Sequence, residues 1–149
     1  MLRVAVKLPA TVDDVGDYFA DVTALEAAGA DTIWLDDTAL EPWVMLGAMA
    51  AVTHRTRLGC LLTLMAPGGN PRLGPAVAAV QMLSRGRVVV GLPQGERRTD
   101  VTALQTTGAR VFTTGSREGS SDGVIFNLES ADQLAADRDA HGAHHMEHI

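Results

Sequence analysis

Two adjacent carboxylates, Asp36 and Asp37, follow a short apolar run in the first quarter of the chain. If this run is a strand of a parallel barrel, its carboxyl end lies where such barrels bind their ligands. A carboxylate at that point can position a reacting group or move a proton. The same pair can instead act as polar caps for the segment that follows. Asp36 and Asp37 are therefore the candidate catalytic residues, with capping as the alternative interpretation.

A hydroxyl and two glycines mark the ends of later apolar runs. Thr63 lies in an otherwise apolar stretch, where its hydroxyl can contact a ligand or bond to a neighbouring strand. Gly91 and Gly95 allow a planar ring to approach the backbone closely, although glycine also ends strands for purely conformational reasons. These residues are candidates for a cofactor contact, and both interpretations stay open.

A further candidate is a loop of small and hydroxyl residues, with Thr114, Gly115, Ser116 and Arg117 in succession. Backbone N–H groups and hydroxyls in such loops bind phosphate, and the guanidinium of Arg117 adds positive charge. A solvated turn is the alternative.

Several histidines could suggest a metal site. His141, His144, His145 and His148 fall at helical spacing, which suits a transition metal. A chain terminus of this composition is usually mobile, however, and His54 stands alone before an apolar run at the end of the fold opposite the expected site. We therefore predict no metal site.

The elements that must position these residues alternate between β-rich apolar runs and longer helical patterns. Strands are predicted at residues 3–8, 31–36, 57–65, 87–92, 110–114 and 123–128. Helices are predicted from Thr11 to Gly29, from Pro42 to Arg55, from Asn70 to Gly86, and over residues 99–107 and 130–140. This alternation is typical of βαβ units around a parallel sheet.

The chain has 149 residues, well short of the roughly 250 that a complete eightfold βα barrel needs. We expect an α/β fold, a truncated TIM-barrel-like (βα) repeat with a mainly parallel sheet of about five to six strands. Residues 1–140 are predicted to form a single domain, and residues 141–149 a flexible His-rich tail.

Composition narrows the range of partners. A net charge of −6, with 20% charged residues, opposes nonspecific attraction to nucleic acid or anionic membranes. No apolar stretch approaches the roughly 18 residues of a membrane span, and the single cysteine, Cys60, cannot form an intramolecular disulfide. A cytoplasmic protein without a membrane or nucleic-acid partner is expected.

Three stretches in order also carry a family resemblance. They are residues 27–37 with Glu41-Pro42 and residues 50–59 behind them, then Asn70-Pro71, and then residues 83–92, which read LSRGRVVVGL and are followed by Gln94-Gly95. Together they resemble the luciferase-like monooxygenase family, whose members use flavin mononucleotide (FMN) or the deazaflavin F420. The resemblance covers roughly residues 3–95, and residues 121–126 resemble a later strand of the same family.

The resemblance implies an oxidoreductase that transfers hydride to, or monooxygenates, a small organic substrate with FMN or F420 as cofactor. It implies that Asp36 or Asp37 faces the isoalloxazine ring or the substrate, and that the backbone near Thr63 and Leu64 bonds to the ring edge. The residues expected to bind the cofactor are Leu8, Thr63, Leu64, Gly91, Gln94, Gly95, Thr114, Gly115, Ser116 and Arg117.

Two alternatives to an enzyme remain, a cofactor-binding protein without turnover and a self-assembling barrel remnant. An incomplete sheet leaves unpaired edges, and its helices expose apolar area, so we expect self-association. In the family, dimers form mainly through the second and third helices. The small and apolar residues of segments 43–52 and 76–82 fit such an interface, and a homodimer is predicted.

Overall fold

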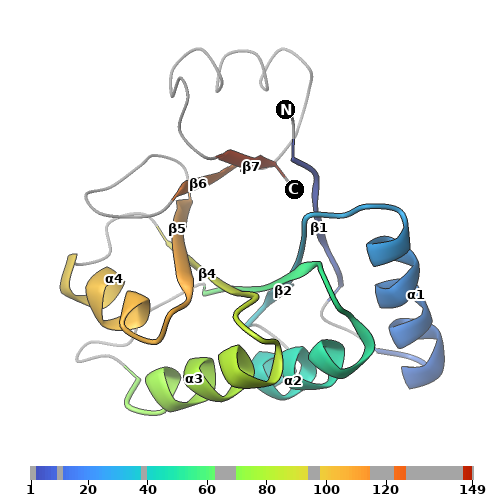
Figure 1. Cartoon of the computed structure of the whole chain (residues 1–149), viewed down its shortest axis with the longest axis horizontal. Coiled ribbons are helices and arrows are strands. Elements are labelled where there is room, and N and C mark those ends of the chain that lie inside the picture. The colour runs from blue at the N-terminus through green and yellow to red at the C-terminus, as the bar shows by residue number, and fades with distance from the viewer. Residues whose placement is uncertain are drawn as a thin grey trace.

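The computed structural model describes residues 3–9, 12–37, 40–62, 70–93, 98–114, 123–126 and 146–148, and the account of the structure is confined to them. The expected α/β architecture is confirmed. A parallel sheet curls into a ring, and helices lie outside it (Figure 1).

The sheet contains seven strands, which pair in chain order from first to last. Their bounds are β1 Ala5–Lys7, β2 Thr32–Asp36, β3 Arg57–Leu61, β4 Val88–Leu92, β5 Arg110–Thr114, β6 Gly123–Phe126 and β7 Met146–His148. Every neighbouring pair is parallel. The two end strands, β1 and β7, contact each other, so that the sheet nearly closes on itself.

Four helices connect the first five strands. They are α1 Val15–Ala27, α2 Pro42–Val52, α3 Leu73–Leu83 and α4 Arg98–Gln105. Consecutive helices pack against one another along the outside of the sheet, as the right-handed connection of parallel strands requires.

Local sequence explains where two of these helices begin. The Asp14 carboxylate accepts a hydrogen bond from the backbone N–H of Asp17 at 2.9 Å and so caps α1. Pro42 occupies the first turn of α2, where its missing N–H costs nothing, and Glu41 caps that helix by accepting from Trp43 N.

Two apolar cores lie on opposite faces of the sheet. Side chains alternate along each strand, so that Ile33 and Leu35 enter the large core between sheet and helices while Trp34 enters the barrel interior. The interior core consists of Ala5, Trp34, Leu61, Val89 and Phe112.

Several sequence predictions need adjustment. The first helix is capped by Asp14, because the carboxylate three residues before Asp17 reaches that N–H, and Thr11, the expected start, lies outside the described residues. Helix α3 begins at Leu73 rather than Pro71, and Asn70 instead accepts from Arg72 N at 3.0 Å in the turn before it.

The sheet has one strand more than the expected five to six, because Met146–His148, within the segment expected to be a flexible tail, pair with β6 as β7. The helix expected at 130–140 lies outside the described residues. None of the helices in the described ranges is long and apolar enough to cross a bilayer.

Candidate functional site

An ion pair lies at the carboxyl ends of the first two strands. Lys7, the last residue of β1, places its Nζ 3.6 Å from Oδ2 of Asp36, the last residue of β2. Lys7 is in register with Trp34, two residues before Asp36, so a long side chain reaches the carboxylate diagonally across the pair of strands. Since Ala5 and Trp34 face the barrel interior, Lys7 and Asp36 lie on the same inward face by alternation.

Two further carboxylates lie close to this pair. Asp37 follows β2 directly, and Glu41 caps α2. Burial raises the pKa of the Cys60 thiol, and the negative charges of Asp37, Asp36 and Glu41 raise it further. The thiol is therefore neutral and is no nucleophile, while the end of β2 carries a local excess of negative charge.

Gly91 extends this inward surface to the fourth strand. It is in register with Leu61 on β3 and Phe112 on β5, and it lies two residues after inward-facing Val89. Because glycine has no side chain, a flat ligand could approach the backbone closely at this position.

The barrel interior beside these residues is aromatic. Gly59, the register partner of Trp34 on β3, lies against the indole, whose ring centroid is 6.2 Å from that of Phe112. The guanidinium carbon of Arg110 lies 5.2 Å from the Phe112 centroid, in cation–π contact. Trp34 and Phe112 are fully buried and fill part of the barrel interior.

Of the residues predicted from sequence, Asp36, Asp37 and Gly91 lie at this mouth. Leu8 follows β1 and donates its backbone N–H to Trp34 O at 3.0 Å, but its side chain packs in the core on the helix side of the sheet. A cofactor would meet only its backbone.

Most other predicted cofactor contacts lie outside the described residues: Thr63, Leu64, Gln94, Gly95, Gly115, Ser116 and Arg117. Thr114 is described through its backbone alone, as the last residue of β5, in register with Ile125.

Sequence reasoning missed Lys7. Its signal was the strand period, which places Lys7 on the same face as Ala5 and at the same end of the sheet as Asp36.

Within the described ranges no group of three or more His, Cys, Asp or Glu side chains could hold a metal ion.

Comparison with known proteins identifies the framework of this site. A family model described as luciferase-like monooxygenase matches residues 3–110, which include β1 to β4 and the Lys7–Asp36 pair. The chain belongs to the luciferase-like monooxygenase family.

Curated relatives match over shorter stretches. An uncharacterized protein of Mycobacterium bovis is 38% identical over 74 residues, which cover 40% of this chain and 26% of the relative. A phthiodiolone/phenolphthiodiolone dimycocerosates ketoreductase of a Mycobacterium species is 41% identical over 66 residues, covering 41% of this chain and 17% of the relative. The chain thus matches about a quarter or less of the length of these relatives.

Two solved structures share the fold. A monooxygenase from Streptomyces bottropensis superimposes with a TM-score of 0.56 at 15% identity, over 95% of this chain and 66% of that one. A coenzyme F420 dependent tetrahydromethanopterin reductase from Methanopyrus kandleri gives a TM-score of 0.59 at 14% identity, over 85% of this chain and 56% of that one. At these identities the likeness establishes the barrel architecture of the luciferase-like family.

Proposed function

We propose that this luciferase-like protein is an oxidoreductase that binds FMN or F420 at the carboxyl ends of its strands and acts on a small organic substrate. The observation that carries the proposal is the inward-facing Lys7–Asp36 ion pair at 3.6 Å, at the barrel end where ligands bind and within the segment that matches the family. When bound, either cofactor supplies the hydride or oxygen chemistry.

The described residues fit the ring of such a cofactor. Gly91 has no side chain on the inner wall, and Phe112 beside it and Trp34 give this part of the barrel interior an aromatic surface. The carboxylates of Asp36, Asp37 and Glu41 disfavour an anionic group at the end of β2. We therefore expect the uncharged ring near β2 to β4 and the phosphate away from β2, toward Thr114 at the end of β5.

In this arrangement Lys7 and Asp36 act as a coupled pair. The ammonium stabilises the carboxylate of Asp36, whose side chain is 24% exposed, and holds it in a fixed position at the mouth. Asp36 can then orient a substrate hydroxyl or accept a proton from it, and Lys7 can donate a hydrogen bond to a substrate carbonyl. Asp37 and Asp36 together keep other anions away from this edge.

The test is a fluorescence titration of the purified protein with FMN and with F420, followed by turnover assays with the cofactor that binds. We expect Asp36→Asn and Lys7→Met to lower turnover by about 10²-fold or more, as the loss of a positioned acid–base group does. The matched control is Asp21→Asn on exposed α1, which removes a carboxylate away from the mouth. Failure to bind either cofactor contradicts the proposal, and binding without turnover supports a cofactor-binding protein.

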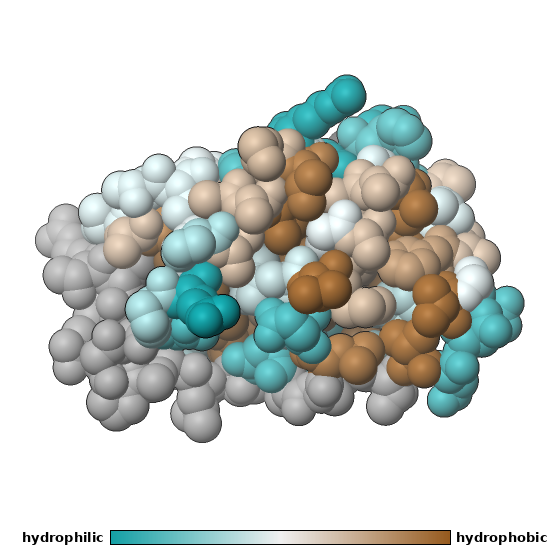
Figure 2. Space-filling view, turned by 90° about the horizontal axis from the view of Figure 1, so that it is seen from below, coloured by the Kyte–Doolittle hydropathy of each residue, from teal (hydrophilic) through white to brown (hydrophobic). Residues whose placement is uncertain are grey.

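A homodimer is part of the proposal. Large apolar side chains are exposed on the two helices named by the family resemblance, with Val44 of α2 69% exposed and Met82 of α3 75% exposed. Figure 2 shows this face, where hydrophobic residues gather over α2 and α3. Burial of such a patch against a second copy is the simplest way to remove it from water.

A further inference from the structure

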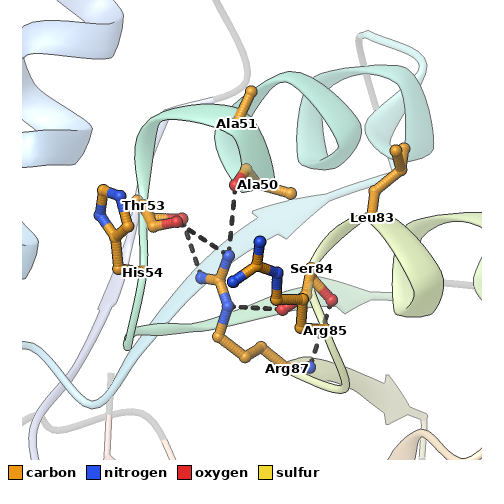
Figure 3. Close-up of a pocket in the computed structure, with 8 residues that line it drawn as sticks. All are labelled: Ala50, Ala51, Thr53, His54, Leu83, Ser84, Arg85 and Arg87. Atoms are coloured by element: carbon orange, nitrogen blue, oxygen red, sulfur yellow. Dashed lines mark hydrogen bonds between the residues drawn. The ribbon is translucent and has the colours of Figure 1, made fainter.

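A cavity of about 310 Å³ opens at the end of the barrel opposite the Lys7–Asp36 pair. Its walls come from the carboxyl end of α2 and from the turn between α3 and β4, immediately before strands β3 and β4 begin. The lining residues are Ala50, Ala51, Thr53, His54, Leu83, Ser84, Arg85 and Arg87 (Figure 3). Two arginines thus share one small cavity.

Arg87 forms the inner wall and has no donor left for a ligand. Its Nε donates to Ser84 O at 2.7 Å, one terminal nitrogen to Thr53 Oγ1 and Thr56 O at 2.9 and 2.7 Å, and the other to Ala50 O and Thr53 O at 3.3 and 3.0 Å. These contacts use all the N–H groups of a guanidinium and cover the last carbonyls of α2. The guanidinium of Arg87 makes this wall positive and offsets the partial negative charge at the carboxyl end of α2.

Arg85 projects into the same cavity from a left-handed backbone. Its φ is 57°, and within the described part of the chain Arg85 is the one residue other than glycine whose φ is positive. Hydrogen bonds from Arg85 N to Met82 O and from Gly86 N to Gln81 O hold this turn. Non-glycine residues in this conformation concentrate at ligand-binding sites, so the turn is a reason to look for a ligand.

The Arg85 guanidinium is not neutralised by its surroundings. It makes no hydrogen bond or ion pair with any residue that the structure describes. Burial lowers the pKa of Arg87, and the nearby charge of Arg85 lowers it further, while Glu26 opposes the shift. The two cations therefore repel each other, and both are among the residues drawn around the cavity in Figure 3.

The other ionisable side chains beside the cavity are those of His54 and Glu26. The His54 side chain is 84% exposed, and its Nδ1 lies 3.6 Å from Oε1 of Glu26. The Glu26 carboxylate is already engaged by backbone N–H groups of residues 54–56. It lowers the positive potential of the cavity without contacting Arg85.

The remaining wall is apolar. Ala50, Ala51 and the exposed side chain of Leu83 lie on it, next to the apolar face of α2 and α3. We propose that this cavity binds a small organic anion, whose carboxylate or phosphate pairs with Arg85 and whose apolar body lies against Leu83 and Ala51. The site is separate from the barrel mouth and takes a second ligand.

The test is a titration of ¹⁵N-labelled protein with phenyl phosphate at constant ionic strength. We expect saturable amide shifts at Ser84, Arg85 and Arg87, with little change at Lys7 and Asp36. Inorganic phosphate should bind more weakly, because it lacks the apolar part. Absence of saturable shifts at the cavity, or shifts confined to the mouth, overturns the proposal.

A pair of variants tests the role of Arg85. Arg85→Asn removes the cation but keeps a residue that tolerates positive φ, and it should weaken phenyl phosphate binding at least about tenfold. Arg55→Asn removes an exposed arginine that does not line the cavity, so it changes the net charge equally and should leave the affinity unchanged. Equal affinities for the two variants contradict the assignment. If Arg85→Asn does not fold, the shift map of the unaltered protein still decides the question.

Discussion

At the scale of single residues, the contact of Gly59 with Trp34 determines how the barrel interior is filled. A Cβ built on Gly59 would lie 2.3 Å from the nearest indole carbon and 2.7 Å from another. The indole is fully buried beside Phe112 and cannot move aside without displacing the rest of the interior core.

Gly59→Ala should therefore lower the free energy of unfolding by about 1 to 3 kcal/mol, the usual cost of overpacking a core. Urea unfolding measures this change. The control is Gly47→Ala in α2, where the nearest atom to the new Cβ is 3.7 Å away. That substitution should stabilise by about 0.5 to 1 kcal/mol, since alanine is the better helix former. A neutral Gly59→Ala would show that the indole has room to shift.

Glu26 is a second residue whose contacts contribute to the stability of the fold. Its carboxylate accepts hydrogen bonds from the backbone N–H groups of His54, Arg55 and Thr56 at 2.8 to 2.9 Å. Burial raises its pKa, but these hydrogen bonds outweigh burial and lower the pKa from 4.5 to about 2. A carboxyl group that is more acidic in the folded state stabilises the fold above its unfolded pKa and loses this effect as pH falls.

The Glu26 contribution should thus be complete above about pH 5 and decline between about pH 4.5 and 2. With the side chain 12% exposed, we expect Glu26→Gln to cost roughly 2 to 3 kcal/mol at pH 7, at about 1.4 kcal/mol per pKa unit. The difference from the unaltered protein should shrink toward pH 2, measured by urea unfolding across this range. Asp21→Asn serves as the control, and a difference that stays constant with pH would exclude this role.

At the scale of elements, Arg87 joins the end of α2 to the start of β4. Its hydrogen bonds to Ala50, Thr53 and Thr56 cross from one βα unit to the next. A lysine has three donors on a flexible stem and cannot reproduce this planar set.

Arg87→Lys should therefore lower the free energy of unfolding by about 2 to 4 kcal/mol, because several buried carbonyls lose a charged donor. Thermal and urea unfolding both measure this change in the free energy of unfolding. Arg55→Lys, an exposed change of the same kind, should alter stability by less than about 0.5 kcal/mol. Similar values for the two variants would rule out the bridging role.

The elements themselves were largely predictable from sequence. The predicted run 110–114 coincides with β5, and residues 31–36 differ from β2 by one residue, because apolar runs between turn residues are the strongest strand signal. The short strand β7 was not predictable, since Met-Glu-His has no apolar alternation and its pairing depends on β6. Lys7 was missed for a related reason: its importance comes from Asp36 on another strand, a contact that register alone creates.

At the scale of the whole molecule, the exposed apolar face of α2 and α3 leads to a prediction about assembly. If this face is the homodimer interface, Val44→Asp or Met82→Asp places a charge in the buried region of each subunit. Either change should shift the protein toward monomer by at least about tenfold in dissociation constant, measured by sedimentation equilibrium. Asp substitution of Val15, which is exposed on α1, is the control. A protein that is monomeric before any substitution contradicts the dimer.

Because Cys60 is buried, the reactivity of its thiol can be used to measure how often the sheet opens. This is the chain's one cysteine, it is fully buried in β3, and burial keeps its pKa raised and its thiol protonated. A thiol-reactive dye can label it only after β3 separates from the helices that cover it. Labelling rates in native buffer should therefore report the free energy of sheet opening without denaturant, and a destabilised variant such as Gly59→Ala should label faster by the factor its unfolding predicts.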